Sequence, residues 1–191
     1  DEAKNSPIAQ QLFYLPFVKT VYISSNFIAI TPGSVTNLIN TGTVTSLLVY
    51  ANWSAVDVGR LNADVITTFT NYGVLRSLGS GYGVYAGINA TIGTFNNGQG
   101  GNGSTASSTA LKYFGKLPTN YNVIVTSPTR YGQLSVTSAA GSTIIGIYAG
   151  GVSGVAASVL GVGTYSSVLT GMAAGNITGA TTGTYGSYGW S

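Results

Sequence analysis

The sequence contains no cysteine and no histidine, and only four of its 191 residues are Asp or Glu and seven are Lys or Arg. Without thiolates or imidazoles, the chain lacks the usual ligands of zinc, haem and iron–sulfur clusters, and it cannot build a Ser–His–Asp or Cys–His nucleophilic site. We therefore predict no catalytic residue, no metal, no cofactor and no enzymatic activity. Because few carboxylates are available to titrate, stability should also change little with pH.

Three local patterns resemble catalytic or ligand-binding motifs, but each lacks the partners it would need. Asp57 and Asp64 could form a glycosidase pair, although we expect them in a loop with solvated charges. Thr109 and Lys112 give a lone TxxK pattern. Glycines within residues 96–108 spell GxGxxG, but no acid follows Asp64 that could bind a ribose. We predict a mobile surface loop for that segment.

The few charges are scattered, and the formal net charge is +3. No basic cluster could follow a phosphate backbone, so we predict no nucleic-acid partner and no small-molecule substrate. The last acid is Asp64 and the last base is Arg130, which leaves the final 61 residues without side-chain charge. The sequence opens on Asp1 without an initiator Met, which is typical of a mature product of an exported precursor, its signal peptide removed.

Neutral polar residues and glycine supply what charge does not, with 21 Ser, 24 Thr, 14 Asn and 28 Gly. Apolar and polar residues alternate over residues 82–95, which predicts a half-buried strand. Residues 108–114 could form a helical turn. Similar runs rich in Val, Ile, Thr and Tyr predict further strands at 43–53, 63–70, 121–126, 133–137, 143–149, 155–162 and 165–169. Many short strands between turn residues indicate an all-β sandwich or barrel.

Residues 144–162 are uncharged and long enough to cross a bilayer as a helix. Their glycines follow GxxxG spacing, yet no Lys or Arg flanks the segment. The Val and Ile content and the Gly150–Gly151 pair favour two buried strands joined by a turn. A membrane segment remains the alternative.

Four asparagines lie in N-glycosylation sequons: Asn52, Asn89, Asn102 and Asn176. Chance alone accounts for about this number in a chain so rich in Ser and Thr. We nevertheless expect occupancy, because Asn89 lies on the polar face of a predicted strand and Asn102 lies in the predicted loop. Glycans would add solvation to a surface that has few charges.

The amino-terminal segment is apolar and strand-like, with alternation through LFYLPFVKTVYI. It could be the first strand of the domain's own sheet, interrupted at Pro16. Alternatively, it could be an extension that completes the sheet of a neighbouring subunit by strand addition. Because such a contact is head to tail and does not close, it would propagate into a filament. Pattern alone leaves both readings open.

An apolar amino-terminal strand, followed by an all-β body rich in Thr, Ser, Gly and Tyr with scattered sequons and almost no charge, resembles the archaeal thread pilins. This resemblance implies an exported, N-glycosylated, extracellular filament subunit, similar in architecture to type 1 chaperone–usher pilins. It implies an immunoglobulin-like or pilin-like β-sandwich (18–191) with an extended amino-terminal donor strand (1–17). On that pattern residues 5–17 would be the donor, with subunit contacts through Ile8, Leu12, Phe13, Tyr14, Leu15 and Phe17.

We therefore predict a structural subunit of an archaeal pilus or fimbrium, polymerised by donor strand complementation and serving cell adhesion or biofilm formation. Its partners would be copies of itself and covalent N-glycans. Two alternatives belong to other classes. A secreted carbohydrate-binding β-sandwich could use Trp53, Trp190 and several tyrosines as stacking platforms. A membrane-anchored surface-layer protein would use residues 144–162.

Overall fold

The computed structural model describes residues 21–24, 27–30, 34–47, 53–60, 63–100, 109–148, 162–185 and 187–191. Within these ranges the regular elements are β-strands, apart from the three-residue 3-10 helix η3 (Ala174–Asn176). The prediction of an all-β chain is confirmed. The predicted domain boundary between residues 17 and 18 lies outside the described residues.

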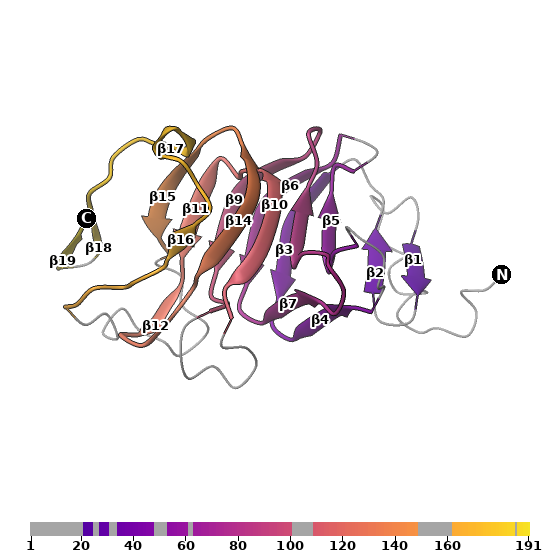
Figure 1. Cartoon of the computed structure of the whole chain (residues 1–191), viewed down its shortest axis with the longest axis horizontal. Helices are drawn as coiled ribbons and strands as arrows, with labels where there is room; N and C mark the ends of the chain where they lie inside the picture. Colours follow the sequence, from indigo (N-terminus) through magenta and orange to yellow (C-terminus); the bar gives the residue numbers. More distant parts are fainter. Residues whose placement is uncertain are drawn as a thin grey trace.

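The described strands form a parallel β-solenoid (Figure 1). A six-stranded parallel sheet runs in the order β17–β15–β11–β9–β6–β3, comprising β3 (Ser34–Asn40), β6 (Val65–Asn71), β9 (Thr91–Asn97), β11 (Asn120–Val123), β15 (Thr143–Ile147) and β17 (Ile177–Thr178). A five-stranded parallel sheet runs in the order β16–β14–β10–β8–β5, comprising β5 (Val56–Val58), β8 (Val84–Ala86), β10 (Leu111–Lys116), β14 (Leu134–Ala140) and β16 (Leu169–Thr170). A short third face consists of β4 (Thr43–Ser46) and β7 (Val74–Ser77), which pair in parallel.

Within the two long sheets, each inner strand pairs with the strand one coil earlier and with the strand one coil later. Asn71 and Asn97 occupy equivalent places on β6 and β9 and lie 26 residues apart. The coils stack along the long axis of the molecule, from β3 and β5 on the right of Figure 1 to β15 and β17 on the left. Because equivalent residues of successive coils lie about 4.8 Å apart, one side-chain type can form a continuous ladder.

Three antiparallel pairs accompany the coils. They are β1 (Val21–Ser24) with β2 (Phe27–Ile30), β12 (Val125–Ser127) with β13 (Arg130–Tyr131), and β18 (Gly183–Tyr185) with β19 (Tyr188–Trp190). The β18–β19 hairpin lies at the opposite end of Figure 1 from β1 and β2.

Aromatic side chains fill the space between the two long sheets. Phe69 and Phe95 are fully buried and stack with ring centroids 4.6 Å apart, and Tyr121 on the next coil meets Phe95 edge-on at 5.9 Å. Tyr113 reaches Phe95 from the opposite sheet, with centroids 6.2 Å apart. These contacts join both sheets into one core.

An asparagine ladder runs through the buried side of the six-stranded sheet. The Asn40 Nδ2 donates to Asn71 Oδ1 at 2.8 Å, and the Asn71 Nδ2 donates to Asn97 Oδ1 at 3.1 Å. Gln99 Oε1 accepts from the Leu75 backbone N–H at 2.8 Å and from Asn71 Nδ2 at 3.3 Å. Across the described residues, every buried side-chain nitrogen and oxygen has a hydrogen-bond partner. The ladder therefore satisfies its polar groups without water.

The predicted immunoglobulin-like sandwich is wrong in its strand pairing. Sandwiches are built from antiparallel strands, whereas the two long sheets here are parallel. Alternation and turn residues identify strands, but they do not specify which strands pair. Solenoid coils and sandwich strands share short length, β-branched residues and glycine-rich turns, so composition favoured both architectures equally.

Several local predictions also require correction. Residues 82–95 form two strands, β8 and β9, separated by a turn in which Ala90 N donates to Gly87 O and Ile88 is exposed. Residues 111–116 are strand β10, whereas a helical turn was predicted at 108–114. In the segment 96–108, predicted as a mobile loop, Asn96, Asn97 and Gln99 are buried and belong to the polar network. Residues 101–108 lie outside the described residues.

The segment at 144–162 begins as strand β15, which supports the strand interpretation as far as Ile147. Residues 149–161 lie outside the described residues. In the part of the chain that the structure describes, no helix has the length and apolar character needed to cross a membrane.

We predict that the buried phenols limit stability at high pH. Burial raises the pKa of Tyr113 and of Tyr121 far above their ordinary value, and burial with the neighbouring Tyr148 hydroxyl raises the pKa of Tyr72 to about 12. Because unfolded tyrosines ionise near pH 10 while these remain protonated in the fold, their contribution to the free energy of unfolding should be constant below pH 10 and fall above it.

Each fully buried phenol should contribute a loss of about 1.4 kcal/mol per pH unit above pH 10. Urea unfolding between pH 8 and pH 11.5 measures the slope in wild type and in a Tyr113→Phe/Tyr121→Phe variant. We expect a shallower slope in the variant, because its rings remain and its buried hydroxyls are gone. An unchanged slope would show that other groups set the alkaline limit.

Candidate binding face

The outward side of the five-stranded sheet carries half-buried aromatic rings beside exposed and half-buried cations. Register aligns Asp57 on β5, Tyr85 on β8, Phe114 on β10 and Thr137 on β14 in one row across four coils. Their neighbours in sequence, such as Val84 and Tyr113, point inward and are buried. Because successive side chains of a strand point to opposite faces of the sheet, the side chains of this row point outward.

We name this surface the ring–lysine face, and define it as Arg60, Tyr82, Tyr85, Lys112, Phe114 and Lys116. Tyr85 and Phe114 stack with centroids 5.1 Å apart and planes 5° from parallel, and Tyr82 lies 4.9 Å from Phe114. The Arg60 guanidinium carbon lies 3.9 Å from the Tyr85 ring centroid. The stack therefore places Arg60 and Phe114, from the coils before and after, against the two sides of Tyr85.

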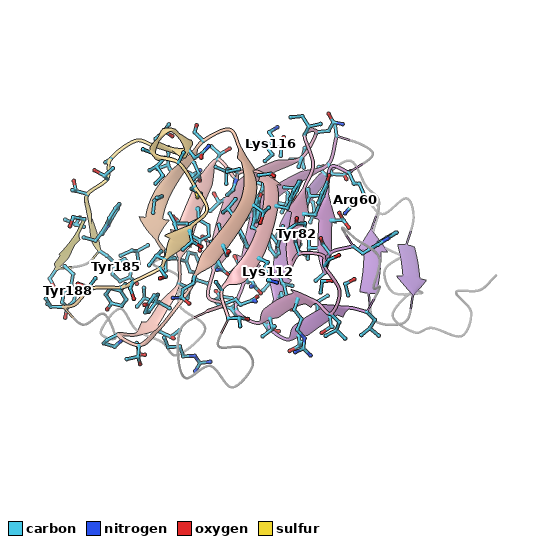
Figure 2. All side chains as sticks on the ribbon, in the orientation of Figure 1. Arg60, Tyr82, Lys112, Lys116, Tyr185 and Tyr188 are labelled. Carbon is cyan, nitrogen blue, oxygen red and sulfur yellow. The ribbon has the colours of Figure 1, made fainter. Side chains whose placement is uncertain are left out.

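Two lysines flank the stack on a single strand. β10 alternates buried and exposed positions, so Lys112, Phe114 and Lys116 share its outward side while Leu111, Tyr113 and Gly115 point inward. Figure 2 places Lys112 and Lys116 near opposite ends of β10, with Tyr82 beside the strand and Arg60 towards β5. Tyr185 and Tyr188 lie on the distant β18–β19 hairpin and take no part in this surface.

The charges on this surface are unevenly compensated. Arg60 Nε donates to Asp57 Oδ1 at 2.8 Å, and its NH2 group lies 2.7 Å from the same oxygen. Loss of solvation raises the pKa of Asp57, and the Arg60 guanidinium opposes that rise. No ion pair within the described ranges involves Lys112 or Lys116. The face therefore carries two uncompensated positive charges beside its rings.

Gly115 allows β10 to keep both lysines outward. Its φ is +95°, and a Cβ there would lie 2.1 Å from the Ala86 carbonyl oxygen of the neighbouring coil. The pairing with β14 shifts register at the same place, between Phe114 and Lys116. Only glycine fits both the backbone angle and this close approach.

The structure describes two of the four sequon asparagines. Asn89 is exposed in the turn between β8 and β9. Asn176 ends η3, where its Nδ2 donates to Gly141 O at 2.8 Å and its Oδ1 accepts from Ala173 N at 2.9 Å. Asn52, Asn102 and the predicted donor residues Ile8, Leu12, Phe13, Tyr14, Leu15 and Phe17 lie outside the described residues.

The other residues singled out in the sequence are not brought together. Trp53 precedes β5 and Trp190 lies in β19, and Figure 1 shows these two strands well apart, with the solenoid coils between them. Asp64 Oδ2 accepts from Gly59 N at 3.0 Å, which fixes the loop after β5, while Asp57 pairs with Arg60. Asp57 lies in strand β5 and not in a loop, and it stays exposed while it pairs with Arg60, whereas Asp64 is half-buried.

The ring–lysine face has no local motif in the sequence, and the signal that could have indicated it is a repeat. The segments TFTN (68–71) and TFNN (94–97) recur 26 residues apart and occupy equivalent places on β6 and β9. Aligning the sequence on that period would have indicated stacked coils. On that period Tyr85 would align with Leu111, three residues short of Phe114, which is the residue it pairs with.

Comparison with known proteins gave one family match. Residues 1–56 match the family model for the Nfu/NifU scaffold protein amino-terminal domain, a family of iron–sulfur cluster assembly. The match covers less than a third of the chain and ends at Val56, the first residue of β5. No curated protein and no solved structure matched.

This match overturns the pilin interpretation. It is to a scaffold family and not to a pilin family, and the proteins of that family are typically intracellular. The predictions of a pilus or fimbrial subunit, of adhesion, of an extracellular location and of a glycosylated homopolymer are therefore wrong. The carbohydrate-binding sandwich and membrane-anchored alternatives gain no support either. The physical basis also fails, because the described strands form solenoid coils where donor strand exchange presumes an incomplete sandwich.

The chain itself does not fit an iron–sulfur cluster. Clusters are held by cysteine thiolates, with histidine as an occasional replacement, and the sequence contains neither residue. Among the described residues, no group of three or more Asp or Glu side chains is placed to hold a metal ion. If the chain shares a role with the matched family, that role does not depend on its own cluster ligands.

Proposed function

We propose that the protein is a non-catalytic scaffold that holds a partner protein against its ring–lysine face. The observation that carries this proposal is the ladder of Arg60, Tyr85 and Phe114, which three successive coils fix on the outward side of one sheet. Rings that are already immobilised lose little conformational entropy on binding, and aromatic residues dominate the energetics of protein interfaces.

The solenoid supports this role by its rigidity. Phe69, Phe95 and Tyr113 pack directly behind the face, and the asparagine ladder fixes the opposite sheet. Parallel coils therefore hold outward side chains at constant spacing, as repeat proteins do on their binding surfaces. The matched family is described as a scaffold protein, which agrees with a binding role and requires no chemistry from this chain.

A selection with random peptides tests the proposal. A phage-displayed library of 12-residue peptides is selected on immobilised wild-type protein, and the enriched clones are then measured on a Lys112→Ser/Phe114→Ser/Lys116→Ser variant. We expect most enriched clones to lose binding to this variant, because the side chains that make the surface are gone.

A second variant controls for net charge. Arg76→Ser/Arg130→Ser also removes two positive charges, from exposed positions on β7 and β13 that lie outside the ring–lysine face. The selected clones should keep their binding to it. Equal binding to both variants, or no enrichment on wild type, would contradict the proposal, provided that circular dichroism shows both variants folded.

A further inference from the structure

We infer that the ring–lysine face recognises an extended acidic segment of a partner protein, in which acid, apolar and acid residues occupy alternate positions. This inference rests on the proposed scaffold function and specifies its partner. The central observation is the outward row Lys112, Phe114 and Lys116 on one strand. The sequence feature that such a partner would carry is Glu-x-Leu-x-Glu or a close equivalent.

The charges favour an anionic partner. Lys112 and Lys116 have no ion-pair partner within the described ranges, and the nearest acid in this sheet, Asp57, is held by Arg60. From residue 65 to the end, the chain contains four bases and no acid. Positive charge on this surface therefore cannot be balanced by that part of the chain, and carboxylates on a partner complement it.

The spacing favours a polypeptide in extended conformation. Four strand rises of about 3.3 Å give at most about 13 Å between the Cα atoms of Lys112 and Lys116, since the irregularity at Gly115 can only shorten this span. A bound strand has the same rise, and its side chains i, i+2 and i+4 face the same way. Two acids at i and i+4 therefore reach the two lysines while the apolar residue at i+2 meets Phe114.

The stacking argues against a sugar ligand on the same surface. A sugar ring binds an aromatic residue through the open face of the ring. Arg60 covers one face of Tyr85 at 3.9 Å, and Phe114 stacks against it at 5.1 Å from the next coil. Tyr85 therefore presents its edge and its hydroxyl, and the positive edge of an aromatic ring favours carboxylate oxygens over apolar sugar faces.

Fluorescence anisotropy with labelled synthetic peptides tests the inference. The probe is an 11-residue peptide of Ser and Thr with a central Glu-x-Leu-x-Glu, and the matched control has the same composition with the second Glu moved by one residue. We expect the probe to bind about tenfold more tightly than the control. Binding of the probe should weaken as salt is raised from 50 to 300 mM.

Variants of the protein locate the contacts. Lys112→Ser and Lys116→Ser should each weaken binding of the probe about two- to fivefold, and Phe114→Ser should weaken it about tenfold. The Arg76→Ser/Arg130→Ser variant should bind the probe as tightly as wild type. Charge reversal avoids any question of folding, because Lys112 is exposed. Lys112→Glu should weaken binding of the acidic probe and restore binding of one of two probes, in which either the first or the second Glu is replaced by Lys.

Three outcomes would overturn the inference. The shifted peptide could bind as well as the probe, the charge-reversed pair could fail to recover, or polygalacturonate could bind the face more tightly than the peptide. If face-dependent phage clones are found but carry no spaced acids, the inference is wrong and the scaffold function stands. If no face-dependent clones are found, the proposed function itself is wrong.

Discussion

Replacing Phe95 with alanine is expected to lower the free energy of unfolding by about 3–5 kcal/mol. Phe95 is fully buried at the centre of the interior stack, where its ring contacts Phe69, Tyr121 and Tyr113. Removing it opens a cavity between coils and between the two long sheets. Parallel coils cannot close that space independently, because each is held in register by its neighbours.

Phe114→Ala provides a matched control for Phe95→Ala. Phe114 is a stacked phenylalanine on the outward side of β10 and is only half-buried, so its removal leaves no closed cavity. We expect a smaller loss, about 1–2 kcal/mol. Urea unfolding followed by circular dichroism measures both variants. Equal losses for the two would contradict the assignment of Phe95 to the common core.

Replacing Asn71 with aspartate is expected to destabilise the protein by about 3–5 kcal/mol at pH 7. The Asn71 side chain is fully buried and donates from Nδ2 to Asn97 Oδ1 at 3.1 Å and to Gln99 Oε1 at 3.3 Å. With aspartate at this position, a carboxylate oxygen would replace the donating Nδ2 and would face Asn97 Oδ1 and Gln99 Oε1, which are both hydrogen-bond acceptors. The middle of the ladder would then hold a buried, unpaired negative charge.

The pH dependence distinguishes this effect from a loss of packing. Burial raises the pKa of the introduced carboxyl above its unfolded value, so the folded state binds the proton more tightly. The penalty is therefore present at neutral pH and is relieved as pH falls towards the unfolded pKa near 4. Urea unfolding at pH 7 and pH 4 measures the difference.

Asn89→Asp serves as the control for Asn71→Asp, because Asn89 is exposed in the turn after β8. Its effect should lie within about 0.5 kcal/mol of wild type at both pH values. A loss for Asn71→Asp that is the same at pH 4 and at pH 7 would contradict the electrostatic explanation.

Several elements of this fold could be read from local patterns. The run at 63–70 predicts β6 within two residues, because its Val, Ile and Thr content suits a strand. The predicted run at 133–137 contains the start of β14, and the predicted run at 143–149 contains the whole of β15. The alternation around Tyr85 predicts a strand there, but it predicts one strand where the structure has two. The turn at Gly87–Ala90 divides them, and the alternating pattern continues across that turn.

Local sequence patterns do not show which strands pair with each other. The partner of Phe69 is Phe95 and the partner of Asn71 is Asn97, and these contacts follow from stacking coils 26 residues apart. A strand with the same alternation could pair antiparallel in a sandwich. The same limitation hid the ring–lysine face, because Arg60, Tyr85 and Phe114 come from three coils and have no motif in common.

The sequence by itself determined that the chain is all-β and that it has no thiolate or imidazole with which to hold a cluster. Both follow from composition, since side-chain chemistry and strand preference belong to single residues. Only the tertiary structure decided that the strands run parallel, that buried asparagines form a ladder, and that rings and lysines from successive coils share one surface. These properties depend on which residues meet across coils, and register is fixed by cooperative packing along the whole solenoid.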